Sequence, residues 1–501
     1  MESNHIVISK KNESYIQFEG DLGVLMEMQE HFSFMVPGAK FHPKVRARIW
    51  DGMIKLLNMG NRTLYAGLHD KVLEFLNARQ YEYAIKPNGY HGLPGEIENI
   101  GPDEIEAFAN SLSICSQNKP IDVRDYQIDA VVNTLQKKRI LLQSPTSSGK
   151  SLILYLTIRY LQQQNPDYKF LIIVPTTSLV SQMTGDFADY SCVNGWDAKE
   201  NIHKITAGEN KKTDKPITIS TWQSIYKMPA SYFNQFDVII CDEAHKLASN
   251  SITGIFEKAT DVKYRIGCTG TVHDAKCHIM VLQGLTGPLY QVTTTRKLMD
   301  TKQVSDLKIK CLILKHSEEV RIAYKKQEYN TELGYIVTND RRNKFIRNLA
   351  LSTEGTTLIL YRFVEKQGEV LYNLIKEASK GREVFLISGS TPTEEREHIR
   401  QYANEHSAIV IASLGTTAAG VNLPAIENII FAHPSKSKIS NLQSIGRGLR
   451  LKDGKTHCTL FDIVDDMSHK NYINHVLRHF GERVKQYTHE QFTYDITKID
   501  I

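Results

Sequence analysis

Cysteine is scarce in this chain and shows no pairing pattern. The seven cysteines among 501 residues include no Cys-x-x-Cys arrangement, and the eighteen histidines do not stand near them at the spacing of zinc ligands. No zinc site is therefore expected. The odd number of cysteines, and the apolar sequence around Cys241 and Cys268, favour a chain whose thiols stay reduced, as in the cytosol.

Long apolar runs are lacking as well. No stretch approaches the length that spans a membrane, and residues 1–5 lack the basic and apolar regions of a signal peptide. With 41% hydrophobic and 23% charged residues, the composition is that of an ordinary soluble protein. We expect a cytoplasmic protein that has no membrane partner.

A strong bias of charge is the third absence. Lys and Arg number 61 against 56 Asp and Glu, and a net charge of +5 is by itself weak support for a nucleic-acid partner. Only local clusters of basic residues can carry that function. The length allows about three domains of ordinary size.

A phosphate-binding loop is the clearest motif that is present. Segment 144–151, Ser-Pro-Thr-Ser-Ser-Gly-Lys-Ser, follows a strand pattern at 139–143 and precedes a helical pattern at 152–163. In this context the loop amides and the helix N-terminus cradle phosphates, Lys150 reaches the β- and γ-phosphates, and the Ser151 hydroxyl holds Mg²⁺. The other expected phosphate-binding positions are Pro145, Thr146, Ser147, Ser148 and Gly149. Because serine replaces the first glycine of the motif, a serine-rich loop with a solvated lysine is the alternative.

Apolar strands alternate with helical patterns from about residue 123 to residue 285, which predicts a doubly wound α/β domain. Every expected strand ends in polar or hydroxyl residues, at the sheet edge where open α/β sheets bind ligands. The expected strands are 169–174, 217–220, 237–241 and 265–268.

Two carboxylates, Asp242 and Glu243, follow the third of these strands. The first can hold Mg²⁺, and the second can orient and deprotonate the attacking water. One carboxylate could not do both, because a metal-bound carboxylate is a poor base. The alternative is a strand-end pair that caps a helix.

A second α/β domain, without a phosphate loop of its own, begins near residue 344. Its segment 443–450, Gln-Ser-Ile-Gly-Arg-Gly-Leu-Arg, places Arg447 and Arg450 on one face if it is helical. Guanidinium groups suit the charge on a transferring phosphoryl group, although a solvated basic helix is the alternative. The two domains together favour a nucleotide in a cleft between them, whose hydrolysis controls closure. The expected strands are 356–361, 383–387, 408–412, 426–431 and 456–463.

The first hundred residues predict a small α+β unit with a basic ribbon. Strand alternation puts Lys44, Arg46 and Arg48 on one face, and Asp51-Gly52 predicts a hairpin turn. A basic ribbon can lie along a phosphate backbone. The alternative is a half-buried hairpin with a solvated charged face.

In this order the motifs resemble those of superfamily 2 helicases and translocases. The matching segments are Arg124-Asp125-Tyr126-Gln127 (Q-motif), 144–151 (motif I), 175–179 (Ia), Asp242-Glu243-Ala244-His245 (II), Thr269-Gly270-Thr271 (III), 413–422 (V) and 443–450 (VI). The resemblance implies two tandem RecA-like doubly wound parallel-sheet domains, ATP with Mg²⁺ as cofactors, and movement on nucleic acid.

The resemblance also implies roles for single residues. Gln127, with Arg124 nearby, would recognise adenine, and Gln443 would act beside the two arginines of motif VI. Nucleotide contacts are implied for Gly420 and Asn422, coupling of hydrolysis to strand movement for His245, Thr269 and Thr271, and DNA contacts for Thr176, Thr221, Ser413 and Thr417. Asn422 stands where many members have an acid.

The flanks resemble the UvsW family of bacteriophage recombination helicases. Segments 32–68, 173–177, 435–439 and 484–494 carry this resemblance. It implies ATP-driven work on branched DNA: fork regression, Holliday-junction branch migration and R-loop unwinding, with 3′-to-5′ polarity. It also implies that the N-terminal domain binds duplex DNA, and that the protein works in the cytoplasm of the phage's host.

From these observations we expect a monomer built of five parts. They are a nucleic-acid-binding α+β domain (1–115), an ATP-binding RecA-like domain (116–290), a connecting segment (291–343), a second RecA-like domain (344–470) and a helical tail (471–501). The rivals within the enzyme class are an RNA helicase and a restriction-type translocase of duplex DNA. Outside it, the rival is a nucleic-acid-binding module that lacks hydrolysis.

Overall fold

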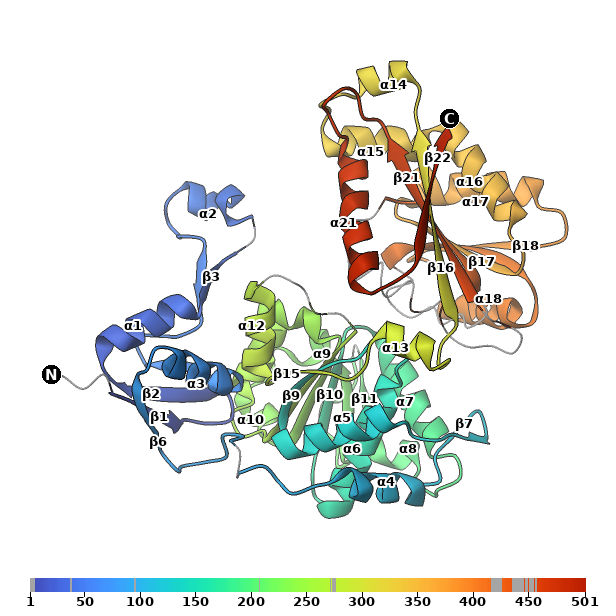
Figure 1. Cartoon of the computed structure of the whole chain (residues 1–501). Coiled ribbons are helices and arrows are strands. Elements are labelled where there is room, and N and C mark those ends of the chain that lie inside the picture. The colour runs from blue at the N-terminus through green and yellow to red at the C-terminus, as the bar shows by residue number, and fades with distance from the viewer. Residues whose placement is uncertain are drawn as a thin grey trace. The chain divides into compact units, whose positions relative to one another are not determined.

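The chain folds into two compact units. The computed structural model describes residues 5–36, 38–93, 96–206, 208–270, 272, 276–415, 426–434, 446, 449, 455 and 457–501 (Figure 1). One unit runs to residue 144 and resumes at 149–292, and the other holds residues 145–148 and everything from 293 onward. Within the described residues, no helix is both long and apolar enough to cross a membrane.

The first unit begins with a four-stranded sheet in the order β5-β2-β1-β6. Its strands are β1 (His5–Lys10), β2 (Tyr15–Gly20), β5 (Thr63–Tyr65) and β6 (Glu82–Ile85), and its helices are α1 (Leu22–His31) and α3 (His69–Ala78). Alternate residues of β1 and β2, such as Ile6, Ile8 and Phe18, are fully buried, as expected where one face of a sheet meets the core. This confirms the small α+β domain.

The basic segment is not the strand that alternation predicted. Residues Pro43–Arg46 form helix α2, and the ribbon consists instead of β3 (Ser33–Met35) paired antiparallel with β4 (Met53–Lys55). His42 caps the helix with its side chain, and proline at the first helical position favours this start. The alternating pattern would put Val45, Ala47 and Ile49 on the opposite face of a strand. It fails as a strand because that face has no core to cover: Ala47 and Ile49 are exposed.

The rest of the first unit is an α/β domain with a seven-stranded parallel sheet, in the order β11-β12-β10-β13-β14-β9-β15. The strands are β9 (Arg139–Gln143), β10 (Phe170–Val174), β11 (Ile202–Ile205), β12 (Ile217–Thr221), β13 (Val238–Asp242), β14 (Tyr264–Thr269) and β15 (Leu289–Gln291). The expected strands are confirmed, and the two edge strands β11 and β15 are additions.

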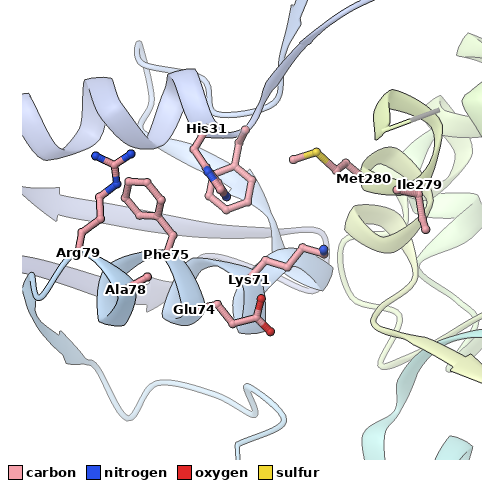
Figure 2. A pocket seen from close by; sticks show the side chains of 9 residues that line it. His31, Lys71, Glu74, Phe75, Ala78, Arg79, Ile279 and Met280 are labelled. Atoms are coloured by element: carbon pink, nitrogen blue, oxygen red, sulfur yellow. The ribbon is translucent and has the colours of Figure 1, made fainter. Parts of the chain in front are cut away.

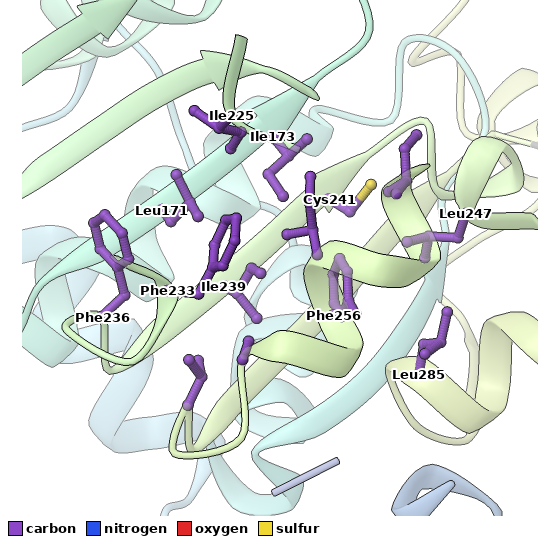
Figure 3. Close-up of a cluster of buried hydrophobic side chains, with 14 of the residues drawn as sticks. Leu171, Ile173, Ile225, Phe233, Phe236, Ile239, Cys241, Leu247, Phe256 and Leu285 are labelled. Atoms are coloured by element: carbon purple, nitrogen blue, oxygen red, sulfur yellow. The ribbon is translucent and has the colours of Figure 1, made fainter. Parts of the chain in front are cut away.

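Helices cover this sheet, and apolar side chains fill the space between. The main helices are α4 (Pro102–Ser111), α5 (Asp125–Lys137), α6 (Lys150–Gln164), α7 (Thr177–Tyr190), α11 (Asn250–Lys258) and α12 (Lys276–Leu285). On one face Leu171, Ile239 and Cys241 pack against Phe233 and Phe256 (Figure 3). Strands buried on both faces explain the nearly continuous apolar runs in the sequence.

The N-terminal domain packs on α12 of the α/β domain. Met280 of α12, 4% exposed, belongs to the N-terminal core, and a Cβ at Gly67 would lie 2.1 Å from the carbonyl oxygen of Gln283. A pocket of about 450 Å³ remains beside this junction, lined by side chains of α3 and α12, among them Lys71 and Met280 (Figure 2). The two parts therefore form one packed body.

The second unit contains another seven-stranded parallel sheet, in the order β18-β19-β17-β20-β21-β16-β22. The strands are β16 (Asp306–Lys315), β17 (Thr356–Tyr361), β18 (Glu383–Ile387), β19 (Ala408–Ser413), β20 (Ile426–Phe431), β21 (His457–Asp466) and β22 (Tyr494–Asp500). The principal helices are α13 (Thr295–Asp300), α15 (Tyr329–Thr338), α16 (Asp340–Ser352), α17 (Glu369–Ala378), α18 (Thr393–Glu405) and α21 (His475–His489). Two tandem RecA-like domains with a small N-terminal domain are thus confirmed.

The expectation of a wholly helical tail is wrong. Helix α21 is followed by strand β22, which pairs in parallel with β16 at the edge of the second sheet. A buried ion pair fixes α21 on the sheet. Arg483 of α21, 1% exposed, donates from Nε and Nη2 to the two carboxylate oxygens of Asp462 in β21. The tail therefore completes the second domain.

The expectation of fully reduced thiols is also wrong for one pair. Cys115, after α4, and Cys192, after α7, form a disulfide across 77 residues of sequence. The same junction is held by Asp189, whose carboxylate accepts hydrogen bonds from Ser116 and Gln117. Tertiary structure alone brings these cysteines together. Cys241, Cys268, Cys311 and Cys458 are buried free thiols.

Candidate active site

The loop between β9 and α6 has the backbone of a phosphate-binding loop. Ser147 and Gly149 adopt positive φ angles of 69° and 80°, and Ser148 donates hydrogen bonds from its amide and hydroxyl to the carbonyl of Pro145. Helix α6 begins directly after Gly149, so its first amides and its positive dipole end face the loop. This arrangement suits a bound anion.

Gly149 also brings the loop against Gln127. A Cβ at residue 149 would lie 2.1 Å from Nε2 of Gln127, so a larger residue would collide there as well as strain the backbone. Gln127, at the start of α5, is 3% exposed, and its Oε1 accepts a 3.0 Å hydrogen bond from the amide of Arg124. The Arg124 guanidinium donates to the Tyr126 hydroxyl at 2.7 Å. Two motifs that the sequence separates by some twenty residues thus meet here.

Lys150 meets both predicted carboxylates. Its Nζ lies 2.9 Å from Oδ1 of Asp242 and 3.7 Å from Oε1 of Glu243. Burial lowers the pKa of Lys150, but the two carboxylates outweigh burial and hold that pKa above its ordinary value. The cation is therefore permanent at neutral pH.

The turn after β13 aims these carboxylates. Glu243 has a φ of 53°, which is uncommon for a residue other than glycine, and its amide donates to Oδ1 of Asp242 at 2.9 Å. Such backbone is retained mainly where the surrounding structure demands it, and functional sites are where it gathers. The turn therefore gives the two carboxylates different positions, although Asp242 and Glu243 are neighbours in the sequence.

His245 joins the end of β13 to the end of β14. Its Nδ1 lies 3.3 Å from Oε2 of Glu243 and 3.2 Å from Oγ1 of Thr269, which is fully buried. The carbonyl of Thr269 in turn accepts a 2.8 Å hydrogen bond from the amide of Ser144. Motifs I, II and III are therefore tied together at one edge of the sheet.

One further contact at this site could not be predicted from the sequence. The Ser151 hydroxyl forms a 2.8 Å hydrogen bond with the hydroxyl of Tyr190, at the C-terminal end of α7. Burial raises the pKa of Tyr190 well above its ordinary value, so this phenol stays protonated. Tyr190 stands 39 residues from the loop and belongs to no motif, so only the packing of α7 on α6 reveals it.

The predicted DNA contacts lie in different environments. Thr176 caps α7 and is partly exposed, whereas Thr221 is 5% exposed and its hydroxyl bonds with that of Ser224. Ser413 ends β19 and is partly buried. Lys44, Arg46 and Arg48 are all exposed, in α2 and the turn after it. The predicted residues Thr271, Thr417, Gly420, Asn422, Gln443, Arg447 and Arg450 lie outside the described residues.

Three family models match successive parts of the chain. Residues 5–86 match the N-terminal domain of the DNA helicase UvsW, residues 120–274 the res subunit of type III restriction enzymes, and residues 340–452 the helicase conserved C-terminal domain. The ATP-dependent DNA helicase uvsW of Enterobacteria phage T4 is 33% identical over 506 residues, covering 97% of this chain and 98% of that protein. The chain belongs to the UvsW family of superfamily 2 helicases.

Solved structures agree with this membership. The crystal structure of T4 UvsW superposes with a TM-score of 0.52 at 30% identity and covers 99% of both chains. A fragment of an HsdR subunit of a type I restriction enzyme from Vibrio vulnificus reaches a TM-score of 0.57, at 20% identity over 81% of this chain and 73% of that one. The second likeness is one of fold alone, whereas the UvsW family relationship extends from the N-terminal domain to the tail.

Proposed function

We propose that this chain is an ATP-dependent helicase that remodels branched DNA. Its reactions would be fork regression, Holliday-junction branch migration and R-loop unwinding, with 3′-to-5′ polarity, carried out by a monomer in the cytoplasm of a phage's host. The observation that carries the proposal is the convergence of Lys150, Asp242 and Glu243 at one sheet edge, in a chain of the UvsW family.

ATP fits the residues at this edge. The loop that ends at Gly149 offers amides and a helix N-terminus, and the cationic Lys150 offers a charge to the β- and γ-phosphates. Gln127, fixed beside the loop, is the candidate for recognising adenine. Arg447 and Arg450 remain predicted partners of the γ-phosphate, and Gln443, Gly420 and Asn422 predicted supports.

Mg²⁺ has a fitting but incomplete set of donors. Ser151 offers a hydroxyl and Asp242 a carboxylate, the hard oxygen ligands that this ion prefers. The described residues hold no group of three or more His, Cys, Asp or Glu side chains that could bind a metal, so ATP phosphates would complete the coordination. When bound, the ion would neutralise charge on the phosphates. Glu243, 3.3 Å from His245, is then the carboxylate available to orient and deprotonate water.

DNA would contact both the two RecA-like domains, which we call the motor, and the N-terminal domain. The exposed Lys44, Arg46 and Arg48 are suited to phosphates, because they are the basic side chains of one projecting element. Thr176, Ser413 and Thr417 are proposed backbone contacts of the motor, and the buried Thr221 would need rearrangement to take part. His245, Thr269 and Thr271 would couple hydrolysis to movement along DNA.

One panel of substrates tests the proposal. ATP turnover is measured with single-stranded DNA, linear duplex DNA, a fork, a Holliday junction, an R-loop and duplex RNA, for the wild type and Lys150→Ala. We expect branched DNA to stimulate turnover most, and the variant to lose about a hundredfold or more of it while still binding DNA. Stimulation by duplex RNA but not by forks would favour an RNA helicase, and equal stimulation by linear duplex a restriction-type translocase. Turnover that Lys150→Ala leaves unchanged would remove the loop assignment.

A further inference from the structure

The turn that carries α2 exposes apolar side chains. We call residues 38–50, at the end of the β3/β4 ribbon, the ribbon tip (Figure 1). Phe41 is 63% exposed and Ile49 is 75% exposed. Large apolar groups that stand on a projecting element, away from the core, commonly mark a binding surface.

The ribbon tip is a built structure and not a loose loop. The amide of Val36 donates to the carbonyl of Gly52 at 2.8 Å, and the Trp50 indole donates to the carbonyl of Met53 at 2.9 Å. The amide of Ile49 donates to the carbonyl of Lys44 at 2.8 Å, which closes the turn after α2. The fold thus fixes the backbone of this turn, and both Phe41 and Ile49 remain exposed on it.

Charge identifies the occupant as nucleic acid. The ribbon tip contains Lys40, Lys44, Arg46 and Arg48 and no acidic residue. The Lys40 ammonium lies 5.1 Å from the centre of the Phe41 ring, so a cation and an aromatic face stand together. Stacked bases flanked by phosphates are the partner that needs both an apolar surface and cations.

The base of the ribbon is fixed to the motor. Strand β3 packs on α12, the helix that follows β14 and Thr269 in sequence, and Met280 of α12 is buried in the N-terminal core. Gly67 lies so close to the carbonyl of Gln283 that no side chain would fit. A tip anchored in this way can bear a load when the motor draws DNA past it.

We infer that the ribbon tip is the strand-separating wedge of this helicase. Phe41 and Ile49 insert against the last base pair at the branch point and stack on the unpaired bases, while Lys44, Arg46 and Arg48 bind the phosphates on either side. The inference rests on the proposed function, since it needs a motor that pulls branched DNA.

The test compares two variants of the full chain. Phe41→Ser with Ile49→Ser removes the apolar groups of the ribbon tip, and Leu22→Ser with Met26→Ser removes two equally exposed apolar groups of α1, which are 57% and 60% exposed. Fork unwinding, fork-stimulated ATP turnover and the fluorescence of 2-aminopurine placed at the branch point are measured for each. We expect 2-aminopurine fluorescence to rise in the wild type as the base pair at the branch point opens. Loss of stacking in the tip variant should slow unwinding about tenfold and abolish this rise, while its ATP turnover stays within about twofold of the wild type. The α1 variant should match the wild type in all three.

The outcomes separate the wedge from the motor. Normal unwinding by the tip variant overturns the wedge alone, whereas a wild type that hydrolyses no ATP on forks overturns the proposed function. A wild type that self-associates in sedimentation, through a surface that the tip variant lacks, also overturns the wedge, because the apolar groups would then cover a second copy. An equal loss in both variants would assign the effect to general surface damage and contradict the inference.

Discussion

Lys150 holds two carboxylates at once, so the site is poised with its cation and its acids already paired. Nζ of Lys150 lies 2.9 Å from Oδ1 of Asp242 and 3.7 Å from Oε1 of Glu243, so both carboxylates lie beside the start of α6, next to the phosphate loop. The sequence predicted these three residues because each follows an apolar strand or the serine-rich phosphate loop, where position along the chain dictates position in the sheet. Tyr190 could not be predicted in this way, because its contact with Ser151 depends on how two helices pack.

Glu243→Gln should stop hydrolysis without stopping ATP binding. The amide keeps the size of the side chain but cannot take a proton from water, so turnover should fall about a hundredfold or more. Radiolabelled ATP should remain on the purified variant in a filter-binding assay. Normal turnover by this variant would show that another group is the base.

Tyr190→Phe should weaken the use of Mg²⁺. The variant leaves the Ser151 hydroxyl without its 2.8 Å partner, and loss of one such hydrogen bond is worth about 1 kcal/mol. The Mg²⁺ concentration that half-saturates ATP turnover should therefore rise about fivefold, with turnover at saturating Mg²⁺ nearly unchanged. An equal Mg²⁺ dependence in variant and wild type would reduce Tyr190 to a packing residue.

Among the elements, helix α2 differs most clearly from the strand that the sequence pattern predicts. The alternation of basic and apolar residues from Lys44 to Trp50 mimics a strand, yet Pro43 and the His42 cap start a helix there. Lys44, Arg46 and Arg48 are nevertheless exposed, in α2 and the turn after it, so their proposed role in binding DNA does not depend on the strand. The central parallel strands were predictable because burial on both faces demands long apolar runs; the edge strands β11, β15 and β22 are shorter or more polar and lack that signal.

Arg46→Ala with Arg48→Ala should weaken binding to forks and flatten its dependence on salt. Each phosphate contact contributes about 0.9 to the slope of log affinity against log salt, so the slope should fall by about 1.8. Fluorescence anisotropy of a labelled fork at several salt concentrations measures it. If affinity is unchanged across the series, these arginines are only a solvated face of the helix.

Strand β20, which ends two residues before His433, should lose stability in mild acid. Burial, and then Arg362, Arg342 and Arg483, lower the pKa of His433 to about 3, so the folded state keeps the imidazole neutral. The unfolded imidazole, with a pKa of about 6.5, gains a proton as pH falls, which costs the folded state about 1.4 kcal/mol between pH 7.5 and pH 5.5.

Hydrogen exchange of a peptide that spans β20 measures this loss locally. The wild type should lose protection between pH 7.5 and pH 5.5 after correction for the intrinsic rate, and His433→Asn, which has no such group to charge, should lose about 1.4 kcal/mol less. Parallel behaviour of the two proteins would mean that His433 does not titrate as described.

At the scale of the whole molecule, the N-terminal domain and the ATP-binding domain share one body. Met280 reaches the N-terminal core from α12, and α12 continues from β14, which ends at Thr269 beside His245. The packing of α12 therefore joins the base of the ribbon to the domain that carries Lys150, Asp242 and Glu243. We predict that one chain performs both hydrolysis and strand separation, and that each activity can be lost without the other: altering Lys150 or Glu243 should stop hydrolysis, and altering the ribbon tip should stop strand separation.

Conversion of a synthetic replication fork under single-turnover conditions tests the central claim most directly. The wild type should convert the fork into regressed duplex products only when hydrolysable ATP and Mg²⁺ are present, and Glu243→Gln should bind the same fork and leave it intact. Rapid ATP hydrolysis by the wild type with the fork left unchanged would contradict the account.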